Sequence, residues 1–436
     1  MTEDGREGPE GRESRGGRGA GEGQLALFPL RGLRYAPNLV SGLAEVTSPP
    51  YDVLDAEGVL ALESSDPHNV VRLILPREEE SGPEGRYRHA ALTLDAWIDA
   101  GVLRPDAEPG LYVYEQSDSS GVLQRGLVGA LGLRDPADRV VLPHEDVMPG
   151  PVADRLELMR AAQANVEPIL LMYDGERGAT SQVVARVATQ PPVVAATDSG
   201  GITHRLWHLV DATELATVRA DLAGRQALIA DGHHRYAAYR ALQSEQHAAS
   251  GPGPWDRGLA LLVDLRAYPP AVGAIHRTVA GLDLDDALSL AKDLFEERPV
   301  AASEVESELA ALRPGELLLV GPDRAAVLVA RDPQRVQAMV VRDHPEPWGR
   351  LDTAVLHHVL AERLWDVPDE RISYHHDAGR AIDRVRSHGG VGILLAPVRV
   401  EDVLAIAAEG VRMPRKSTSF GPKPRTGFVL RSFRLG

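Results

Sequence analysis

The stretch Asp231-Gly232-His233-His234-Arg235-Tyr236 decides how the middle of this chain folds. A short apolar run, residues 227–230, precedes it, and a stretch of helical composition, residues 236–242, follows it. The pattern predicts a strand that enters a tight turn at Gly232 and continues as a helix. The first N–H groups of such a helix have no partner within it, and this end of the helix dipole is positive. Two imidazoles and a guanidinium at the same point predict a site for an anionic oxygen, with phosphate as the best fit.

A plainer interpretation of the same residues stays open. Asp231 is a good helix cap, and the histidines and the arginine would then lie on a solvated surface. Two features favour the anion site: the basic side chains occupy consecutive positions, and a strand leads directly into the turn. The stretch 231–236 is therefore the first candidate for a functional site.

The composition narrows the function classes. The 436 residues carry 47 Lys and Arg against 63 Asp and Glu, which gives a formal net charge of −16. This balance argues against broad nucleic-acid binding, which needs cationic side chains to neutralise phosphates. The chain has no cysteine, so disulfides, thiolate nucleophiles and thiolate metal sites are excluded.

Location follows from the apolar runs. None approaches the roughly 20 residues that span a bilayer, and the polar start of the chain lacks the apolar core of a signal peptide. We therefore expect a cytoplasmic protein with no membrane partner. Residues 1–23, rich in glycine and charge, are predicted to be a disordered tail.

Lysine is rare, and its placement predicts a second anion-binding segment. The chain has 44 arginines (47 minus 3) but only three lysines, Lys292, Lys416 and Lys423, and the last two stand within eight residues. A lysine ammonium is compact and its donors rotate, whereas a guanidinium is a planar fork. Unless this clustering is chance, we expect Lys416, Ser417, Thr418 and Lys423 to contact a phosphoryl oxygen or a small carboxylate.

The order of apolar and polar runs predicts an α+β fold with mixed sheets and interspersed helices. A domain at 24–250 contains the turn, residues 250–254 form a Pro/Gly-rich connector, and a domain at 255–436 contributes the loop with Lys416. Strands are expected at 25–30, 69–75, 111–116, 126–131, 169–173, 201–210, 227–230, 259–265, 316–320, 325–330, 391–396 and 426–433. Helices are expected at 87–100, 152–165, 212–222, 236–242, 284–296, 303–312, 352–364, 376–387 and 400–409.

Three further segments place polar side chains where they would line a pocket. A double-proline turn at 47–53 stiffens the backbone and presents a phenol and a carboxylate. An imidazole stands beside carboxylates at 144–146, which suits a base with a tuned pKa, and a second His-Arg pair occurs at 276–277. A brace for the loop, or polar side chains that simply face water, would give the same pattern. With the arginine after Asp154, the candidates are Tyr51, Asp52, His144, Glu145, Arg155, His276 and Arg277.

Familiar cofactor motifs are absent from the sequence. It has neither a G-x-x-x-x-G-K-[ST] loop nor a G-x-G-x-x-G turn after a strand, so a P-loop or a Rossmann cofactor is not indicated. H-E-x-x-H and D-x-D-x-D-G are also missing, and adjacent histidines such as His375-His376 point about 100° apart on a helix. We therefore predict no protein-built metal site. Mg²⁺ bound mainly through phosphate would leave no such signature.

Six motifs in this order resemble the domain of unknown function 1015 family of bacteria and archaea. They are Ser48-Pro-Pro-Tyr-Asp-Val53, His144-Glu145, Asp154-Arg155, Asp231-Gly-His-His-Arg-Tyr236, Leu351-Asp352 with Leu356-His357, and Lys416-Ser-Thr418 with Pro422-Lys423. The resemblance spans residues 24–436. The 231–235 turn is also similar to the motif of the ParB/sulfiredoxin superfamily, in which a turn at a helix start holds nucleotide phosphates. This second resemblance implies a ParB/sulfiredoxin-like core followed by a C-terminal α/β region.

Free-serine kinases of that superfamily carry an Asp-Gly-His-x-Arg version of the motif. The resemblance therefore implies a phosphotransferase that moves a phosphoryl group from ADP or ATP to a small hydroxyl metabolite such as serine. Gly232 and Arg235 would hold phosphates, His233 and His234 would neutralise developing charge, and Asp231 or, less favoured, Glu145 would act on the acceptor hydroxyl.

The alternative is a regulatory protein that binds a nucleotide or a phosphometabolite without catalysis. Specific DNA binding is a distant third, because the chain is acidic and no recognition helix stands out. The sequence favours no particular oligomeric state.

Overall fold

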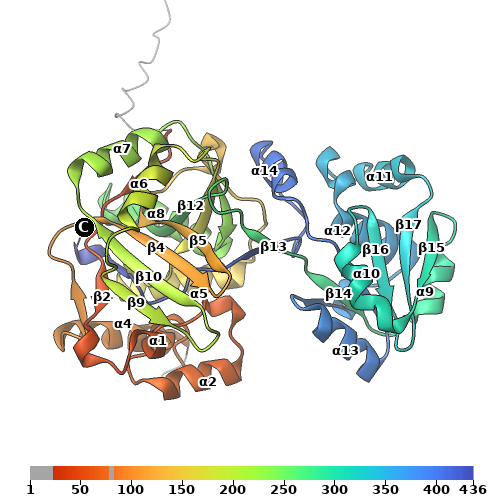
Figure 1. Cartoon of the computed structure of the whole chain (residues 1–436), viewed down its shortest axis with the longest axis horizontal. Coiled ribbons are helices and arrows are strands. Elements are labelled where there is room, and N and C mark those ends of the chain that lie inside the picture. Colours follow the sequence, from red (N-terminus) through yellow and green to blue (C-terminus); the bar gives the residue numbers. More distant parts are fainter. Residues whose placement is uncertain (1–22, 78–82, 436) are drawn as a thin grey trace, which may run out of the picture.

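The computed structural model describes residues 23–77 and 83–435. Apart from Gly23, the predicted tail at 1–23 lies outside the described residues. Figure 1 shows two lobes, joined by β13 (Ala271–Gly273) and by a C-terminal segment, residues 413–435, that returns from the second lobe to the first. Helices and strands alternate in both lobes, so the predicted α+β class is confirmed. Across the described residues, no helix has the length and apolarity to cross a bilayer.

A mixed nine-stranded sheet forms the body of the first lobe within the described residues. Its strand order is β6-β11-β8-β12-β5-β4-β10-β9, with β1 paired to β5. The β4–β5 hairpin at its centre matches the predicted strand pair around the turn at 118–121. The strands are β1 (Leu27–Phe28), β4 (Leu111–Asp118), β5 (Gly121–Gly132), β6 (Val141–Leu142), β8 (Ile169–Tyr173), β9 (Val194–Thr197), β10 (Thr203–Leu209), β11 (Ala227–Asp231) and β12 (Arg257–Asp264).

Both faces of this sheet are buried. Leu111 and Val113 of β4 pack in a core shared with four helices that follow in the chain, while Tyr112 and Tyr114 face the C-terminal segment. The inner strands β8 and β12 therefore read as continuous apolar runs. Helix α7 begins where the Asp211 carboxylate accepts the N–H groups of its first turn. The helices on this sheet are α5 (Pro149–Ala162), α6 (Ala179–Val187), α7 (Ala212–Leu222) and α8 (His233–Ser250).

A smaller helical layer covers the lower side of the first lobe in Figure 1. One prediction is wrong in this layer. Residues 69–75, expected as a strand, form a turn and the short helix α3 (Val71–Ile74). The Asn69 side chain accepts the N–H of Val71 and donates to the carbonyl of Glu45, which favours a turn over an extended chain. The other elements are α1 (Leu43–Val46), α2 (Ala56–Ser65), α4 (Pro83–Asp99), β2 (Leu33–Tyr35) and β3 (Leu103–Pro105).

The second lobe is an antiparallel sheet of order β15-β17-β16-β19-β14-β18 with helices on both faces. Its predicted strands at 316–320, 325–330 and 391–396 are confirmed. The strands are β14 (His276–Val279), β15 (Phe295–Val300), β16 (Glu316–Val320), β17 (Ala325–Ala330), β18 (Ile372–His375) and β19 (Val391–Leu395). The helices are α9 (Leu284–Ala291), α10 (Val305–Ala311), α11 (Pro333–Val341), α12 (Asp352–Ala354), its π-helical continuation η7 (Val355–Leu364) and α13 (Ala378–His388). Helix α14 (Val400–Ala408) lies between the two lobes in Figure 1.

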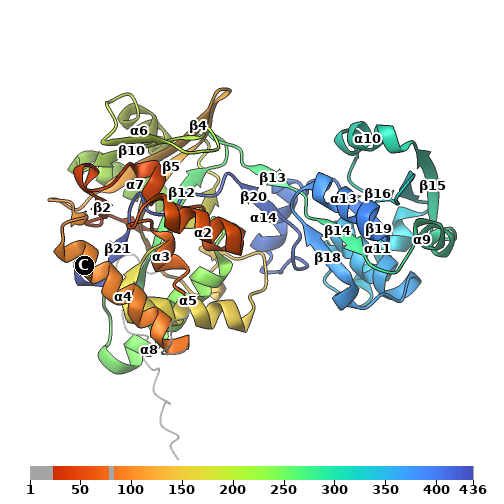
Figure 2. The same ribbon diagram turned by 90° about the horizontal axis from the view of Figure 1, so that it is seen from below.

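The lobes do not divide where the sequence predicted. Strand β12 pairs with β5 and β8 of the first sheet, so the Pro/Gly-rich stretch at 250–254 is a loop inside the first lobe. The C-terminal segment also belongs largely to the first lobe, and Figure 2 shows it running back from the second lobe into the first. Its pairings are β20 (Ser419–Gly421) with β13, and β21 (Arg431–Ser432) with β7 (Ala164–Asn165).

The expected last strand at 426–433 is wrong for most of its length. Only β21 is a strand, and Thr426 forms an isolated bridge to Ser48. The segment pairs with a different partner every few residues, so no continuous ladder forms. Its apolar residues read as a strand because they are buried against the first sheet.

The predicted strand, turn and helix at 227–242 are confirmed. Strand β11 runs parallel to β6 and antiparallel to β8, with a bulge between Ile229 and Asp231 that re-aims the last residue. Gly232 takes the left-handed conformation (φ 94°, ψ 32°) and begins α8 without a side-chain cap. A Cβ at this position would lie 2.8 Å from Cγ2 of Ile169. Glycine is required here both for its backbone angle and for the close approach of β8.

We therefore expect Gly232→Ala to lower the free energy of unfolding by about 3 kcal/mol, since it adds left-handed strain to a steric clash. Denaturant unfolding measures the loss. Gly201→Ala is the matched control, because Gly201 also has a positive φ (81°) but a Cβ there meets open space. That variant should lose only about 1 kcal/mol. Equal losses in the two variants would contradict the role given to Ile169.

Candidate functional site

Asp231 is the centre of a charge network at the end of β11. Its Oδ2 accepts a hydrogen bond from Nη2 of Arg235 at 2.5 Å, and its Oδ1 lies 2.8 Å from Nζ of Lys423. The same ammonium donates to Oδ2 of Asp52 at 2.7 Å. One lysine of the C-terminal segment thus joins the double-proline turn to the 231–236 turn. The structure brings together three motifs that are up to 371 residues apart in the chain.

Burial disfavours the ionised forms of the side chains in this network, but the neighbouring opposite charges have the larger effect. Burial acts to raise the pKa of Asp52, but the charges of Lys423 and Arg235 hold that pKa below its usual value. Burial acts to lower the pKa of the Lys423 ammonium, but Asp231 and Asp52 raise it. Lys423 and Asp52 are therefore both ionised at neutral pH.

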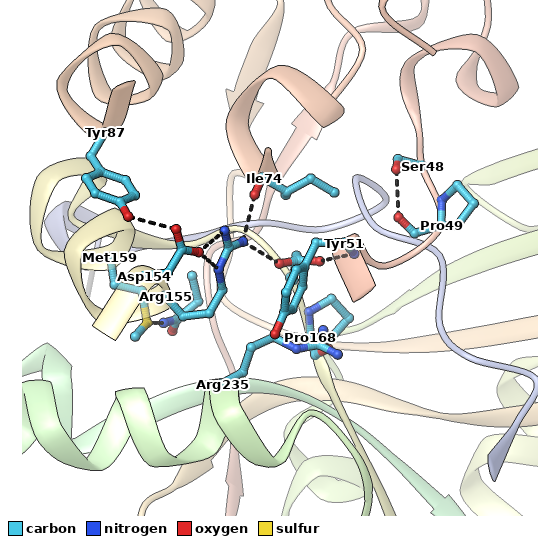
Figure 3. Close-up of polar contacts among 12 residues, drawn as sticks. Ser48, Pro49, Tyr51, Ile74, Tyr87, Asp154, Arg155, Met159, Pro168 and Arg235 are labelled. Carbon is cyan, nitrogen blue, oxygen red and sulfur yellow. Dashed lines mark hydrogen bonds and ion pairs between the residues drawn. The ribbon is translucent and has the colours of Figure 1, made fainter. Parts of the chain in front are cut away.

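Arg235 points into the protein, contrary to the expectation that it holds phosphate. Its side chain is inside the first lobe, with the residue 3% exposed. Nη1 donates to the carbonyl of Pro168 at 2.6 Å, and the guanidinium lies 5.9 Å from the ring centroid of Tyr51. Figure 3 shows Arg235 reaching from α8 toward Pro168 and Tyr51. The guanidinium orients Asp231 rather than an external ligand.

Tyr51 and Arg155, both expected at a pocket wall, belong to the buried network behind Arg235. The Arg155 guanidinium lies 4.3 Å from the Tyr51 ring centroid, and Figure 3 shows the two side chains next to each other. It donates to the carbonyl of Ile74 at 2.7 Å and contacts Oε2 of Glu167 at 3.4 Å. Glu167 also accepts the N–H of Tyr51 at 3.1 Å. These contacts fix the double-proline turn against α5 and α8.

The two histidines of the turn hold a neighbouring loop, residues 143–148. Nε2 of His233 accepts the N–H of His144 at 3.3 Å, and Nε2 of His234 accepts the N–H of Met148 at 3.0 Å. The rings of His144 and His233 meet edge to face with centroids 4.6 Å apart. The imidazoles therefore act as acceptors for backbone N–H groups.

These hydrogen bonds require neutral rings, and the surroundings favour that form. Burial lowers the pKa of His144 to about 3, and it lowers the pKa of His233 well below the usual value, with His144 adding to the effect. Burial also lowers the pKa of the half-buried His234. The expectation that His233 and His234 supply positive charge is therefore wrong at neutral pH in this arrangement.

Glu145 lies on the 143–148 loop and faces the charge network. Burial raises its pKa to about 7; Lys416 acts against the rise and Asp231 adds to it. Its Oε1 is buried and has no hydrogen-bond partner among the described residues. The loop is parallel to the C-terminal segment at this point, through a bridge between Glu145 and Met413. Glu145 can therefore exchange a proton near neutral pH.

The predicted Lys416-Ser417-Thr418 motif passes beside this carboxyl group. Lys416 has a left-handed backbone (φ 57°), and its exposed side chain forms no ion pair within residues 23–77 and 83–435. The next two hydroxyls are buried: Oγ of Ser417 lies 3.1 Å from Oγ1 of Thr353, and Oγ1 of Thr418 lies 2.9 Å from Nε2 of His144. The hydroxyls anchor the loop, and the ammonium stays available.

His276 and Arg277, expected to line the same pocket, lie inside the second lobe on β14. Arg277 is fully buried and donates to the carbonyl of Lys416 at 2.7 Å. Burial lowers its pKa to about 10, and Tyr374 opposes that change. Nδ1 of His276 accepts the N–H of Leu395 at 3.2 Å. Arg277 supports the strained backbone of Lys416, and His276 has a purely structural contact.

Two residues near the site were not among the candidates. Glu167 has no motif around it, and only the folded structure shows that it joins Tyr51 to Arg155. His376, from the loop after β18, has its pKa lowered by burial first and then by the charges of Lys416 and Lys423, so it lies near both lysines. The adjacent histidine pair was the signal for it. Among the described residues, no group of three or more His, Asp or Glu is arranged to hold a metal ion.

Comparison with known proteins identifies the family. The chain belongs to the family described as "Protein of unknown function (DUF1015)", whose model matches residues 27–354. No curated protein matches it.

Among solved structures, a free serine kinase in complex with AMP is similar at 16% identity and a TM-score of 0.33, covering 68% of this chain and 90% of that one. SbnI from Staphylococcus aureus, truncated at its C-terminus, gives 12% identity and a TM-score of 0.35 over 69% and 85% of the two chains. A conserved hypothetical protein from Pyrococcus furiosus gives 14% and 0.33 over 68% and 94%.

The lysine shared by Asp52 and Asp231 supplies a test of the site's architecture. We expect Lys423→Met to lower the free energy of unfolding by about 2 kcal/mol at pH 7, because two carboxylates lose their common cation. The ionised carboxylate of Asp52 contributes its full stabilisation above the pKa that it has in the unfolded chain, about 4. This stabilisation is lost as the pH falls through the lower pKa that Asp52 has in the folded protein. The difference between wild type and variant should therefore shrink in acid.

Denaturant unfolding across a pH series measures this difference. Lys292→Met is the control, because Lys292 is exposed and forms no ion pair in the described part of the chain. Adding Asp52→Asn to Lys423→Met should recover part of the loss, since one uncompensated charge is removed. A loss independent of pH would show that Lys423 stabilises the fold by packing alone.

Proposed function

We propose that this member of the DUF1015 family binds a nucleotide at the start of α8 and transfers a phosphoryl group to the hydroxyl of a small metabolite, as a serine kinase does. The observation that carries the proposal is the meeting of three features at one point: an uncapped helix start at Gly232, the ammonium of Lys416, which forms no ion pair among the described residues, and the protonatable carboxyl of Glu145. Phosphoryl transfer needs positioned donors and charge stabilisation more than a strong nucleophile.

The nucleotide phosphates fit the backbone of α8. The first N–H groups of this 18-residue helix lack intrahelical partners, and no side chain of Gly232 competes for them. Lys416 would place its ammonium on the transferred phosphoryl group, with Lys423 close behind it. Arg235 would not contact the phosphates, because it holds Asp231 in place. Mg²⁺ commonly reaches such sites through the nucleotide phosphates and few protein ligands.

Asp231 and Glu145 would have different roles in the reaction. Both oxygens of Asp231 are engaged by cations, so its carboxylate suits orientation of the acceptor better than proton transfer. Glu145 has an oxygen that accepts no hydrogen bond from the described residues and a pKa of about 7, which suits a general base at neutral pH. The acceptor hydroxyl would give its proton to Glu145 as its oxygen attacks the terminal phosphorus, and the shortened nucleotide leaves.

One observation favours the alternative, a regulatory protein that binds a nucleotide or phosphometabolite without chemistry. His233, His234 and Arg235 are all engaged by groups of the protein itself. A site with these side chains occupied retains an anion-binding helix start but has fewer groups for transition-state stabilisation. The two functions share the phosphate site and differ in whether product forms.

Nucleotide binding is tested by calorimetry with ADP and ATP. Lys416→Ala should weaken binding about tenfold, the loss of one charge-assisted contact. Lys292→Ala, the third lysine of the chain, should leave the affinity unchanged. The proposed phosphate site at the start of α8 would be contradicted if the wild-type protein bound no nucleotide, or if both variants weakened nucleotide binding equally.

Catalysis is tested by incubating the protein with ADP or ATP and L-serine and measuring phosphoserine. The rate should rise with pH and level off above about 7, because Glu145 must be deprotonated to accept the proton. Glu145→Gln should lower the rate by a factor of about 100 or more while nucleotide affinity stays within about twofold. Tight nucleotide binding without turnover on serine and other small hydroxyl compounds would select the regulatory function.

A further inference from the structure

A hollow opens in the second lobe between its sheet and a layer of helices. Its volume is about 400 Å³, within the range of small-molecule sites. Strands β15, β16 and β17 form its floor, and α11 and the start of α12 form its walls. Its apolar lining comes mainly from Phe295, Leu317, Val329, Ala330, Val336 and Val355.

One carboxyl group stands among these apolar walls. Oδ1 of Asp352 accepts the N–H of Gly315 at 2.9 Å, and Asp352 forms no ion pair within the described residues. Burial raises its pKa to about 6, the Gly315 N–H opposes this, and the nearby Glu316 adds to it. The hollow therefore presents a carboxylate that pairs with no cation among the described residues.

The rim of the hollow has the opposite charge. Arg313 and Arg350 also line it, and both are exposed to solvent. The Arg350 guanidinium lies 3.2 Å from Oε1 of Glu346, and its side chain is 71% exposed. Such an exposed pair is weak and exchanges readily with a ligand carboxylate. The cavity thus combines a carboxylate inside, guanidinium groups at the mouth and an apolar floor.

We propose that this cavity binds an α-amino acid with an aliphatic side chain. The ammonium would meet Asp352, the side chain would fill the apolar floor, and the carboxylate would lie at the rim with Arg313 and Arg350. This placement gives the Asp352 carboxylate its missing cation and removes apolar surface from water. It requires no contact with the charge network around Asp231, so it stands independently of the proposed phosphotransfer.

The probe is L-leucine, titrated into the full-length protein by calorimetry, with two analogues that each lack one charged group. Isocaproate lacks the ammonium, and isoamylamine lacks the carboxylate. We expect each analogue to bind at least about tenfold more weakly than leucine, because each forfeits one charge-assisted contact. Leucine binding no tighter than that of isocaproate would overturn the assignment of Asp352.

Asp352→Asn separates this role from a structural one. The amide oxygen can still accept the Gly315 N–H, but the charge is gone, so leucine binding should weaken at least about tenfold while the unfolding transition is retained. Asp283→Asn is the matched control, since Asp283 likewise accepts one backbone N–H at a helix start in this lobe and lies outside the cavity.

Val355→Phe tests the apolar lining, because the larger ring should occupy the space of the leucine side chain and abolish leucine binding with every charge in place. Absence of leucine binding to the wild-type protein, or equal affinity in wild type and Asp352→Asn, would refute the proposal.

Discussion

The ammonium of Lys423 between the carboxylates of Asp52 and Asp231 is the contact on which the first lobe's site depends. Two carboxylates this close repel each other unless a cation lies between them. The cation comes from the C-terminal segment, which has left the first lobe, crossed the second and returned. The site is therefore complete only when the last part of the chain has docked. Because charges at such short range interact strongly in a partly buried setting, the contact also fixes the position of that segment.

A consequence of this arrangement is that most charged groups of the turn serve one another. Arg235 holds Asp231, and Arg155 and Glu167 hold Tyr51 beside it. Buried charges are tolerated only when they are paired and hydrogen-bonded. The side chains that sequence motifs make conspicuous are thus used to build a rigid corner. What remains for a ligand is the backbone of α8, the ammonium of Lys416 and the carboxyl of Glu145.

The sequence predicted the part of this corner that depends on local chemistry. Gly232 between an apolar strand and a helix predicted a tight turn, and the pair of lysines near the C-terminus indicated a second cationic segment. Strand registers and the orientation of Arg235 could not be predicted, because they depend on Pro168 and Tyr51, which lie far away in the chain. The strand expected at 69–75 failed because a short apolar run fits a buried helical turn equally well, and the side chain of Asn69 decides between them.

The two ends of the Lys416 loop are held by different lobes, and this constrains what the site can do. Arg277 of β14 holds the carbonyl of Lys416, and Thr353 of α12 contacts the next hydroxyl, while Thr418 is fixed to His144 of the first lobe. A displacement of one lobe relative to the other must therefore move Lys416 relative to Glu145 and to the start of α8. Thr353 follows Asp352 in the chain, so the helix that borders the hollow of the second lobe also borders this loop. The position of the Lys416 ammonium is therefore set by the packing of both lobes.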